Sequence, residues 1–196
     1  QVSGEENPLG KNMRIIIKAV RDIRRKDNIN YLRRILPTAE WCWDRKRDAM
    51  DTFIRAMRMA GDDPCIHLED DIVLAKDFYR KITNAIKEHP DNVIQFFSMR
   101  KADLEVGSRW DNNYLMNQCH YNPAGYSNLI ADFFTDWDKK ETNASGTDLM
   151  LCDFLKSRKE KYWIHVPSLV DHRVGVSMID PRRASTNRQS KTFTEY

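Results

Sequence analysis

Three consecutive carboxylates, Glu69, Asp70 and Asp71, form the stretch of this sequence with the clearest chemical potential. They follow a short, mostly apolar run at 64–68 and precede a second apolar run at 72–74. A buried strand that ends in a turn here would deliver the carboxylates to the carboxyl edge of a sheet, where open α/β sheets bind ligands. Three adjacent anions need a nearby positive charge, and Mg²⁺ or Mn²⁺ accepts carboxylate oxygens. An acidic turn that only leads into the next helix is the alternative.

Two blocks of this sequence resemble GT-A-type glycosyltransferases. The pattern H-L-E-D-D-I-x-L-x-x-x-F at 67–78 resembles the metal-binding acidic motif of that family, and V-P-S-L-V-x-H-x-x-G-x-S at 166–177 resembles the late segment in which a histidine returns to the metal. The resemblance implies that Asp71 and His172 bind Mn²⁺ or Mg²⁺, which holds a departing nucleoside diphosphate. It covers most of residues 14–177 as an order of motifs, in a chain that is small for the family.

The resemblance also implies contacts to a nucleoside-diphosphate sugar, for which a UDP-sugar is the simplest donor. The end of the first strand contacts the nucleotide in this family, and arginines share the charge of the diphosphate. Glu69 and Asp70 would bind ribose or sugar hydroxyls, or hold metal-bound water. The other implied donor contacts are Val20, Arg21, Arg24, Asp44, Arg47, Arg173 and Arg188.

Asp148, in the pattern G-T-D-L-M-L at 146–151, is the candidate catalytic residue. It is expected at the start of a helix, where the helix dipole commonly stabilises a carboxylate, and this structural role is the alternative. Inverting GT-A enzymes place an Asp or Glu at such a helix start, facing the acceptor hydroxyl. The resemblance therefore implies that Asp148 takes the acceptor proton, a role worth about 10²–10⁴-fold in rate.

The elements that must position these residues alternate between strands and helices. This alternation predicts an α/β fold: a GT-A-like single domain with a mostly parallel central sheet, in which a Rossmann-like nucleotide-binding half is joined to a small acceptor-side half. A functional loop without regular structure is expected over 99–113, around Trp110. Apolar runs and periodicity predict strands at 14–20, 40–44, 64–68, 92–98, 114–121 and 162–166. They also predict helices at 28–36, at 44–61 or 48–61, and at 78–89, 127–137 and 148–155.

Composition describes one globular domain, because 41% of the 196 residues are hydrophobic and 31% are charged. We expect it at 13–180, after a flexible lead or tag remnant at 1–12 and before a basic tail at 181–196 that would close over the donor. No apolar run reaches the roughly 20 residues that span a bilayer, and no secretion signal is visible. The four cysteines are scattered, which favours a reducing compartment. These features predict a cytoplasmic protein without membrane association, in the host cytoplasm if it is phage-encoded.

The charge distribution leaves the acceptor open. Residues 1–60 hold 14 basic and 8 acidic residues, 61–155 hold 9 and 17, and 156–196 hold 9 and 4. Basic ends suit phosphate-binding arginines around a cation site, and they also suit a DNA acceptor such as the hydroxymethylated DNA that bacteriophages modify. A lipopolysaccharide or other glycan is the alternative acceptor. A metal-dependent nuclease or phosphotransferase, and a non-catalytic nucleic-acid-binding module, are the alternatives from other classes.

Overall fold

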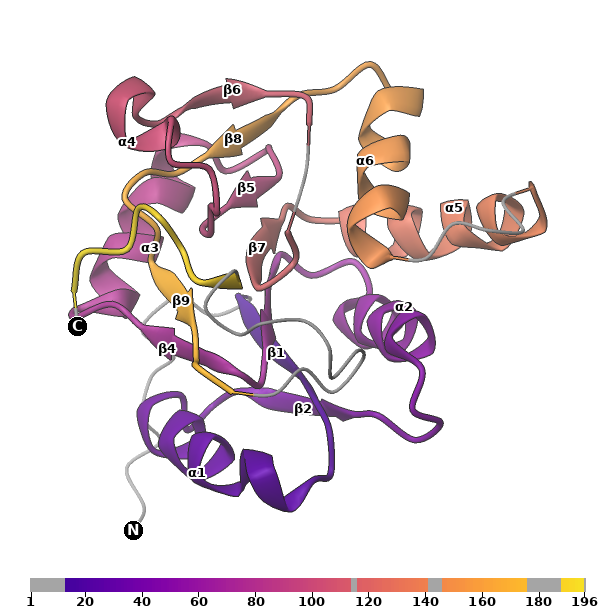
Figure 1. Ribbon diagram of the computed structural model, residues 1–196. Coiled ribbons are helices and arrows are strands. Elements are labelled where there is room, and N and C mark those ends of the chain that lie inside the picture. The colour runs from indigo at the N-terminus through magenta and orange to yellow at the C-terminus, as the bar shows by residue number, and fades with distance from the viewer. Residues whose placement is uncertain (1–12, 114–115, 141–145, 176–187, 196) are drawn as a thin grey trace, which may run out of the picture.

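The structure is a computed structural model that describes residues 13–113, 116–140, 146–175 and 188–195. Within these residues a seven-stranded sheet has the strand order β2-β1-β3-β7-β5-β8-β6 (Figure 1). Its strands are β1 (Arg14–Ala19), β2 (Glu40–Trp43), β3 (Cys65–Glu69), β5 (Ile94–Gln95), β6 (Arg109–Asp111), β7 (Cys119–Asn122) and β8 (Tyr162–Ile164).

Most of these strands run in the same direction. β1 pairs in parallel with both β2 and β3, and β5 pairs in parallel with β8. β7 lies antiparallel between β3 and β5, and β6 is an antiparallel edge strand on β8. The predicted α/β fold with a mostly parallel central sheet is therefore confirmed.

Helices cover both faces of the sheet (Figure 1). Ile15 and Ile17 of β1 lie in one core with α1 and α3, whereas Ile16 packs on α2 on the opposite face, because side chains alternate along a strand. None of the helices among the described residues has the length and apolar character needed to cross a membrane. The helices are α1 (Lys26–Ile35), α2 (Ala49–Ala60), α3 (Phe78–Glu88), α4 (Asp103–Val106), α5 (Tyr126–Lys140) and α6 (Thr147–Ser157), with a 3-10 turn, η1 (Ile23–Arg25), before α1.

Helix α2 illustrates how the local sequence sets an element. Asp48 accepts hydrogen bonds from two backbone N–H groups of the first turn and so caps the helix. Gly61 ends it with a φ of 62°, a conformation that costs glycine little. Phe53 and Met57, one turn apart, are buried in the core shared with α5 and α6.

A second, two-stranded sheet joins parts of the chain that are distant in sequence. β4 (Ile72–Leu74) pairs antiparallel with β9 (Val170–His172), and the register sets Ile72 opposite His172. The acidic motif ends immediately before β4, so this pairing brings the late histidine block to the carboxyl end of β3. The described part of the C-terminal tail, 188–195, packs beside it, and Phe193 is buried in the core.

The prediction of a loop without regular structure over 99–113 is wrong, because this segment contains a helix and a strand. α4 and β6 lie within it, and β6 extends the main sheet. The predicted strand at 114–121 is shorter than expected, because β7 begins only at Cys119, and residues 114–115 lie outside the described residues.

Buried charge holds the 99–113 segment in place. Asp103 is only 1% exposed, and its carboxylate binds Arg100 at 3.1 Å and Arg109 at 2.6 Å. Trp110 packs edge-on against Trp163 of β8, with ring centroids 5.3 Å apart. Ion pairs rather than an apolar repeat stabilise this segment, which explains why hydrophobic periodicity does not predict it.

Candidate functional site

Most of the predicted donor residues lie at the carboxyl edge of β1, β2 and β3. The backbone N–H of Val20, just after β1, donates to Oδ2 of Asp70 at 2.7 Å. The backbone N–H of Asp44, just after β2, donates to the carbonyl of Ala19 at 2.7 Å. Three parallel strands therefore end at one place, and the polar residues that follow them are neighbours.

The three carboxylates of the acidic motif lie near two positively charged side chains, Lys18 and Arg25. Glu69 is in register with Lys18, and its Oε1 lies 4.0 Å from Lys18 Nζ. Arg25 contacts the other two: Nη2 lies 2.8 Å from Asp71 Oδ2, and Nε lies 3.8 Å from Asp70 Oδ1. The carboxylates thus have different environments, although they are consecutive in sequence.

Asp71 and His172 meet at the junction of β4 and β9. His172 Nε2 lies 3.0 Å from Asp71 Oδ2, and both side chains are almost completely buried. His172 Nδ1 lies 2.9 Å from the carbonyl oxygen of Arg173, so Nδ1 carries the proton that it donates. Burial lowers the pKa of His172, which favours the neutral ring. The lone pair of Nε2 then faces a carboxylate oxygen, an arrangement that is repulsive unless a positive group lies beside both atoms.

This pair fits a divalent cation. Asp71 Oδ1 is buried without a hydrogen-bond partner, and the imidazole is oriented through Nδ1 by a backbone carbonyl, as is usual for metal-bound histidines. An imidazole with a carboxylate suits Mn²⁺, and Mg²⁺ often keeps water and substrate phosphates as its other ligands. No group of three or more potential ligand side chains occurs in the described part of the chain.

Arginines provide the positive charge next to this pair in the structure. Arg188 Nη1 donates to His172 Nε2 at 3.0 Å, and Arg188 Nη2 donates to the carbonyl of Gly175. Arg173 reaches the same region, because its side chain donates to Asn28 Oδ1 at 2.7 Å and its backbone N–H donates to the carbonyl of Asp71. Two of the predicted donor arginines therefore lie next to the predicted metal ligands.

Asp70 is engaged by the protein itself. Its carboxylate binds the amide of Val20 and faces Arg25, and its backbone carbonyl accepts a hydrogen bond from the buried Asn28 side chain. Burial raises the pKa of Asp70 to about 6, more than Arg25 and the Val20 amide lower it. The contacts show Asp70 tying β1 to the acidic motif, and its predicted role toward sugar hydroxyls stays a prediction.

A cavity of about 500 Å³ lies beside the ends of β1 and β2. Arg21, Trp43 and Asp44 are among its lining residues. The guanidinium carbon of Arg21 lies 5.4 Å from the Trp43 ring centroid, and Trp41 stacks on Trp43 with an interplanar angle of 15°. A planar aromatic wall with a carboxylate and an arginine offers the groups that recognise a nucleobase: a stacking face, an acceptor and a donor.

Arg24 and Arg47 lie apart from these groups. Both oxygens of Asp22 accept hydrogen bonds from the Arg24 guanidinium at 2.8 Å, on the exposed surface. Arg47 is exposed, with a φ of 56°, and is not among the residues that line the cavity. The structure thus brings together most of the predicted donor residues, but not these two.

Asp148 lies in the first turn of α6, a helix that packs on the same face of the sheet as α2. Burial lowers the pKa of Lys18, and the charges of Glu69 and Asp148 oppose this lowering. Asn117 connects the same groups, because its carbonyl accepts from Lys18 Nζ at 3.2 Å and its side-chain amide donates to Thr147 Oγ1 at 2.8 Å. Asp148 therefore shares a polar centre with Lys18.

Sequence reasoning missed Lys18, Arg25 and Asn28. Lys18 ends an apolar strand, where a lysine normally indicates an exposed position, although it is buried here. Arg25 stands in the basic run 21–26, and only the η1 turn determines which of these side chains points inward. Asn28 is buried early in α1, and an asparagine at such a position is only a weak sequence signal of a functional site.

Comparison with known proteins gives little further information. No protein-family model matches this chain, and no curated protein matches it. Among solved structures it is similar to UDP-glucose pyrophosphorylase complexed with UDP-glucose, with 9% sequence identity and a TM-score of 0.44, over 81% of this chain and 74% of that chain. A likeness this distant carries no argument about activity. The fold and the site together define an α/β protein whose polar site lies at the carboxyl edge of a mostly parallel sheet.

Proposed function

We propose that this chain is a metal-dependent glycosyltransferase that moves a sugar from a nucleoside-diphosphate sugar to a hydroxyl acceptor. The observation that carries the proposal is the 3.0 Å contact between Asp71 and His172. A carboxylate at a strand end and a neutral imidazole from a distant segment would form part of a divalent cation site. Phosphate oxygens of a nucleotide would complete it.

The residues around this pair have roles that follow from their charge. Asp71 and His172 would hold Mn²⁺ or Mg²⁺, which would supply charge neutralisation for a departing diphosphate. Arg25 and Arg188 contact the pair and would share the phosphate charge, because guanidinium groups bind phosphate in a bidentate manner. Arg173, exposed at the end of β9, would do the same at the outer rim.

The nucleobase of a UDP-sugar would bind in the cavity beside β2. Trp43 offers a ring face, Arg21 a guanidinium, and Asp44 a carboxylate. The end of β2 adjoins the end of β1, through the hydrogen bond from Asp44 to Ala19, and β1 adjoins the acidic motif. A base at β2 and a diphosphate at Asp71 would therefore lie along one edge of the sheet.

The acceptor hydroxyl would be activated on the face of the sheet that α2 and α6 cover. Asp148 would take the proton of the acceptor hydroxyl if the reaction inverts the anomeric centre, which requires a base opposite the leaving group. Glu69, whose Oε1 lies 4.0 Å from Lys18 Nζ, would contact sugar hydroxyls. The DNA acceptor stays a prediction from charge, since no contact in the structure distinguishes DNA from a glycan.

A nucleotide screen tests this proposal. The correct nucleoside diphosphate or UDP-sugar should raise the melting temperature beyond the effect of Mn²⁺ alone, and only when Mn²⁺ is present. Sugar release from the same donor should then require Mn²⁺, and Asp71→Ala should abolish it. Asp132→Asn, on the exposed part of α5, is the matched control and should keep full activity.

The same assays separate the other classes. A nuclease or phosphotransferase would cleave a phosphodiester or transfer phosphate, and it would leave the sugar nucleotide intact. A wild-type protein that binds nucleic acid but neither binds nor turns over any sugar nucleotide would contradict the proposal and favour a binding module.

A further inference from the structure

Gln118 has a buried side-chain oxygen that forms no hydrogen bond with any described residue. It directly precedes β7 and is 6% exposed, and Oε1 is its unpartnered atom. A buried amide oxygen without a partner costs folding free energy, and such a group in a native structure calls for an explanation. The neighbouring Asn117 is 1% exposed, and its Oδ1 also lacks a partner in the described part of the chain. Two consecutive amide oxygens can thus accept hydrogen bonds from a ligand.

The sheet sets Gln118 beside the acidic motif. The backbone N–H of Glu69 donates to the carbonyl of Gln118 at 3.1 Å, which extends the antiparallel ladder of β3 and β7 by one pair. The two residues therefore lie opposite each other at the carboxyl end of β3, close to Asp71 in sequence. Side chains in directly opposite positions of an antiparallel pair have Cβ atoms about 4.5–5.5 Å apart.

The alternation of side chains along β7 determines the face of the sheet on which Gln118 lies. Cys119 is buried in the core that α1 and α3 cover. His120 points to the opposite face, where its ring stacks on Phe53 of α2 with ring centroids 6.2 Å apart. Because side chains two positions apart share a face, Gln118 lies on the α2 face with His120.

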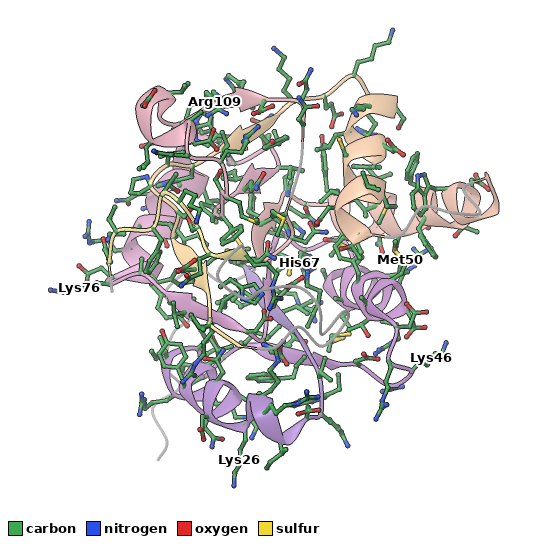
Figure 2. All side chains as sticks on the ribbon, in the orientation of Figure 1. Lys26, Lys46, Met50, His67, Lys76 and Arg109 are labelled. Atoms are coloured by element: carbon green, nitrogen blue, oxygen red, sulfur yellow. The ribbon has the colours of Figure 1, made fainter. Side chains whose placement is uncertain are left out.

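Glu69 lies on the same face as Gln118. His67, near the centre of Figure 2, stacks on His120 with ring centroids 5.1 Å apart, and Glu69 follows His67 by two positions along β3. A row of side chains at the end of the sheet thus runs from Lys18 through Glu69 to Gln118. A ligand group next to this row would meet a carboxylate and an amide side by side.

The chemistry of this row fits a hydroxyl group. An amide side chain accepts through its oxygen and donates through its NH₂ group, and a hydroxyl can do both in return. A phosphate group offers only acceptors, so it would leave the amide oxygens unpaired and would be repelled by Glu69. The nearest cation, Lys18, is already engaged, because its Nζ donates to the carbonyl of Asn117 at 3.2 Å.

We propose that Gln118 is a specificity-determining residue that accepts a hydrogen bond from a hydroxyl group of the donor sugar. This inference rests on the proposed function, in which the diphosphate lies at Asp71 and the sugar follows it. Gln118 lies opposite Glu69, which that function assigns to sugar hydroxyls, whereas Asn117 binds Thr147 at the start of α6, on the acceptor side. A sugar without that hydroxyl would bind poorly, because the buried amide would be left unpaired.

Calorimetric titration with Mn²⁺ separates binding of the sugar from binding of the nucleotide. UDP-glucose, UDP-galactose and UDP-N-acetylglucosamine are compared with UDP, and the UDP-sugar that binds most tightly is used with the variants. Gln118→Met removes both polar ends of the amide at similar length. It should weaken binding of that UDP-sugar by about 5- to 100-fold and change the Kd of UDP by less than about twofold.

The stability of the free protein distinguishes an amide that binds a ligand from one that supports the fold. Gln118→Met removes an unpartnered polar atom, so Tm without ligand should not fall. Gln95→Met is the matched control, because Gln95 is 2% exposed in β5 and its amide donates to the carbonyl of Phe97. This control should lower Tm and leave the ratio of the two Kd values unchanged. A lower Tm of Gln118→Met together with an unchanged ratio would overturn the role of Gln118.

Deoxy analogues of the same UDP-sugar test the role in wild type, and they suffice if Gln118→Met does not fold. One analogue should bind wild type about 5- to 100-fold more weakly than the parent UDP-sugar does, and Gln118→Met should bind the two equally. Equal binding of wild type to the parent and to every deoxy analogue would overturn the proposal.

The outcome for UDP separates the two proposals. If UDP and a UDP-sugar bind with Mn²⁺ and Gln118→Met leaves the ratio of their Kd values unchanged, only the role of Gln118 is overturned. If neither UDP nor any of the three UDP-sugars binds with Mn²⁺, the glycosyltransferase assignment itself is contradicted, and the role of Gln118 falls with it.

Discussion

Replacing Asp71 by Asn should abolish stabilisation of the protein by Mn²⁺. The carboxylate would lose the charge that a divalent cation needs, while its shape would stay the same. Asp71 Oδ1 has no hydrogen-bond partner, and Oδ2 lies 3.0 Å from an imidazole nitrogen that is favoured to be unprotonated. Cation binding should therefore give the unpartnered Oδ1 of Asp71 a partner. His172→Gln should also abolish stabilisation by Mn²⁺, because it removes the other ligand.

The size of the expected stabilisation by Mn²⁺ follows from mass action. At a concentration 100-fold above Kd, a ligand that binds only the folded state stabilises it by about 2.7 kcal/mol. For a chain of this length each kcal/mol raises Tm by about 2–4 °C, so saturating Mn²⁺ should raise Tm by about 5–11 °C. The Asn variant also weakens the contact with Arg25, at a cost of about 3 kcal/mol to the metal-free protein. The relevant quantity is therefore the change in Tm on adding metal to each variant.

Differential scanning fluorimetry with and without Mn²⁺ measures this change, and Glu69→Gln is the matched control. Glu69 belongs to the same acidic triplet but contacts Lys18 on the opposite face, so its variant should keep the full Mn²⁺ shift. The reasoning is refuted if wild type shows no shift, or if Glu69→Gln loses it as completely as Asp71→Asn does.

Three further predictions concern stability. Phe193→Ala should lower the free energy of unfolding by about 3–5 kcal/mol in urea titration, because the ring anchors the C-terminal segment in the core; a loss below about 1 kcal/mol would contradict this packing. Asp103→Ala should cost about 1.5–3 kcal/mol, because Arg100 and Arg109 lose a buried carboxylate partner and keep Asp111, whereas Arg58→Ala in an exposed pair should cost less than about 1 kcal/mol; equal losses would refute the distinction. Burial lowers the pKa of His67 and His120 well below 6.5, so the unfolded chain binds protons that the folded chain excludes. Stability should therefore fall as pH drops below about 6.5, by about 1.4 kcal/mol per unit for each such histidine, and His67→Gln should lower that slope by about this amount; an unchanged slope would argue against a neutral His67.

The part of the fold formed by β1, β2 and β3 could be predicted from sequence because its elements have strong local signals. The run of isoleucines at 15–17 predicts a buried strand, and β1 forms there. The cap Asp48 and the stop at Gly61 bound α2 as expected. The parallel order of β1, β2 and β3 follows from the alternation of strands and helices.

The rest depends on contacts that local patterns do not encode. β6 forms because Asp103 binds two arginines, and no period of two marks it. Arg25 rather than Arg24 reaches the acidic motif, because the η1 turn rotates one side chain inward. Lys18 is buried because Glu69 and the start of α6 compensate its charge, and these groups are distant in sequence.

The site was predicted through motif order, and its chemical roles are still predictions. The resemblance links the acidic motif with the histidine block, and the structure sets Asp71 and His172 in contact through β4 and β9. Their role as metal ligands, and that of Asp148 as a base, await experiment.

The most direct test of the central claim is an anomalous difference map from crystals grown with UDP and MnCl₂. Our account predicts one strong manganese peak in contact with the Asp71 carboxylate, His172 Nε2 and the diphosphate. A peak at another group of carboxylates, or no peak with Arg25 and Arg188 still bound to Asp71 and His172, would contradict it.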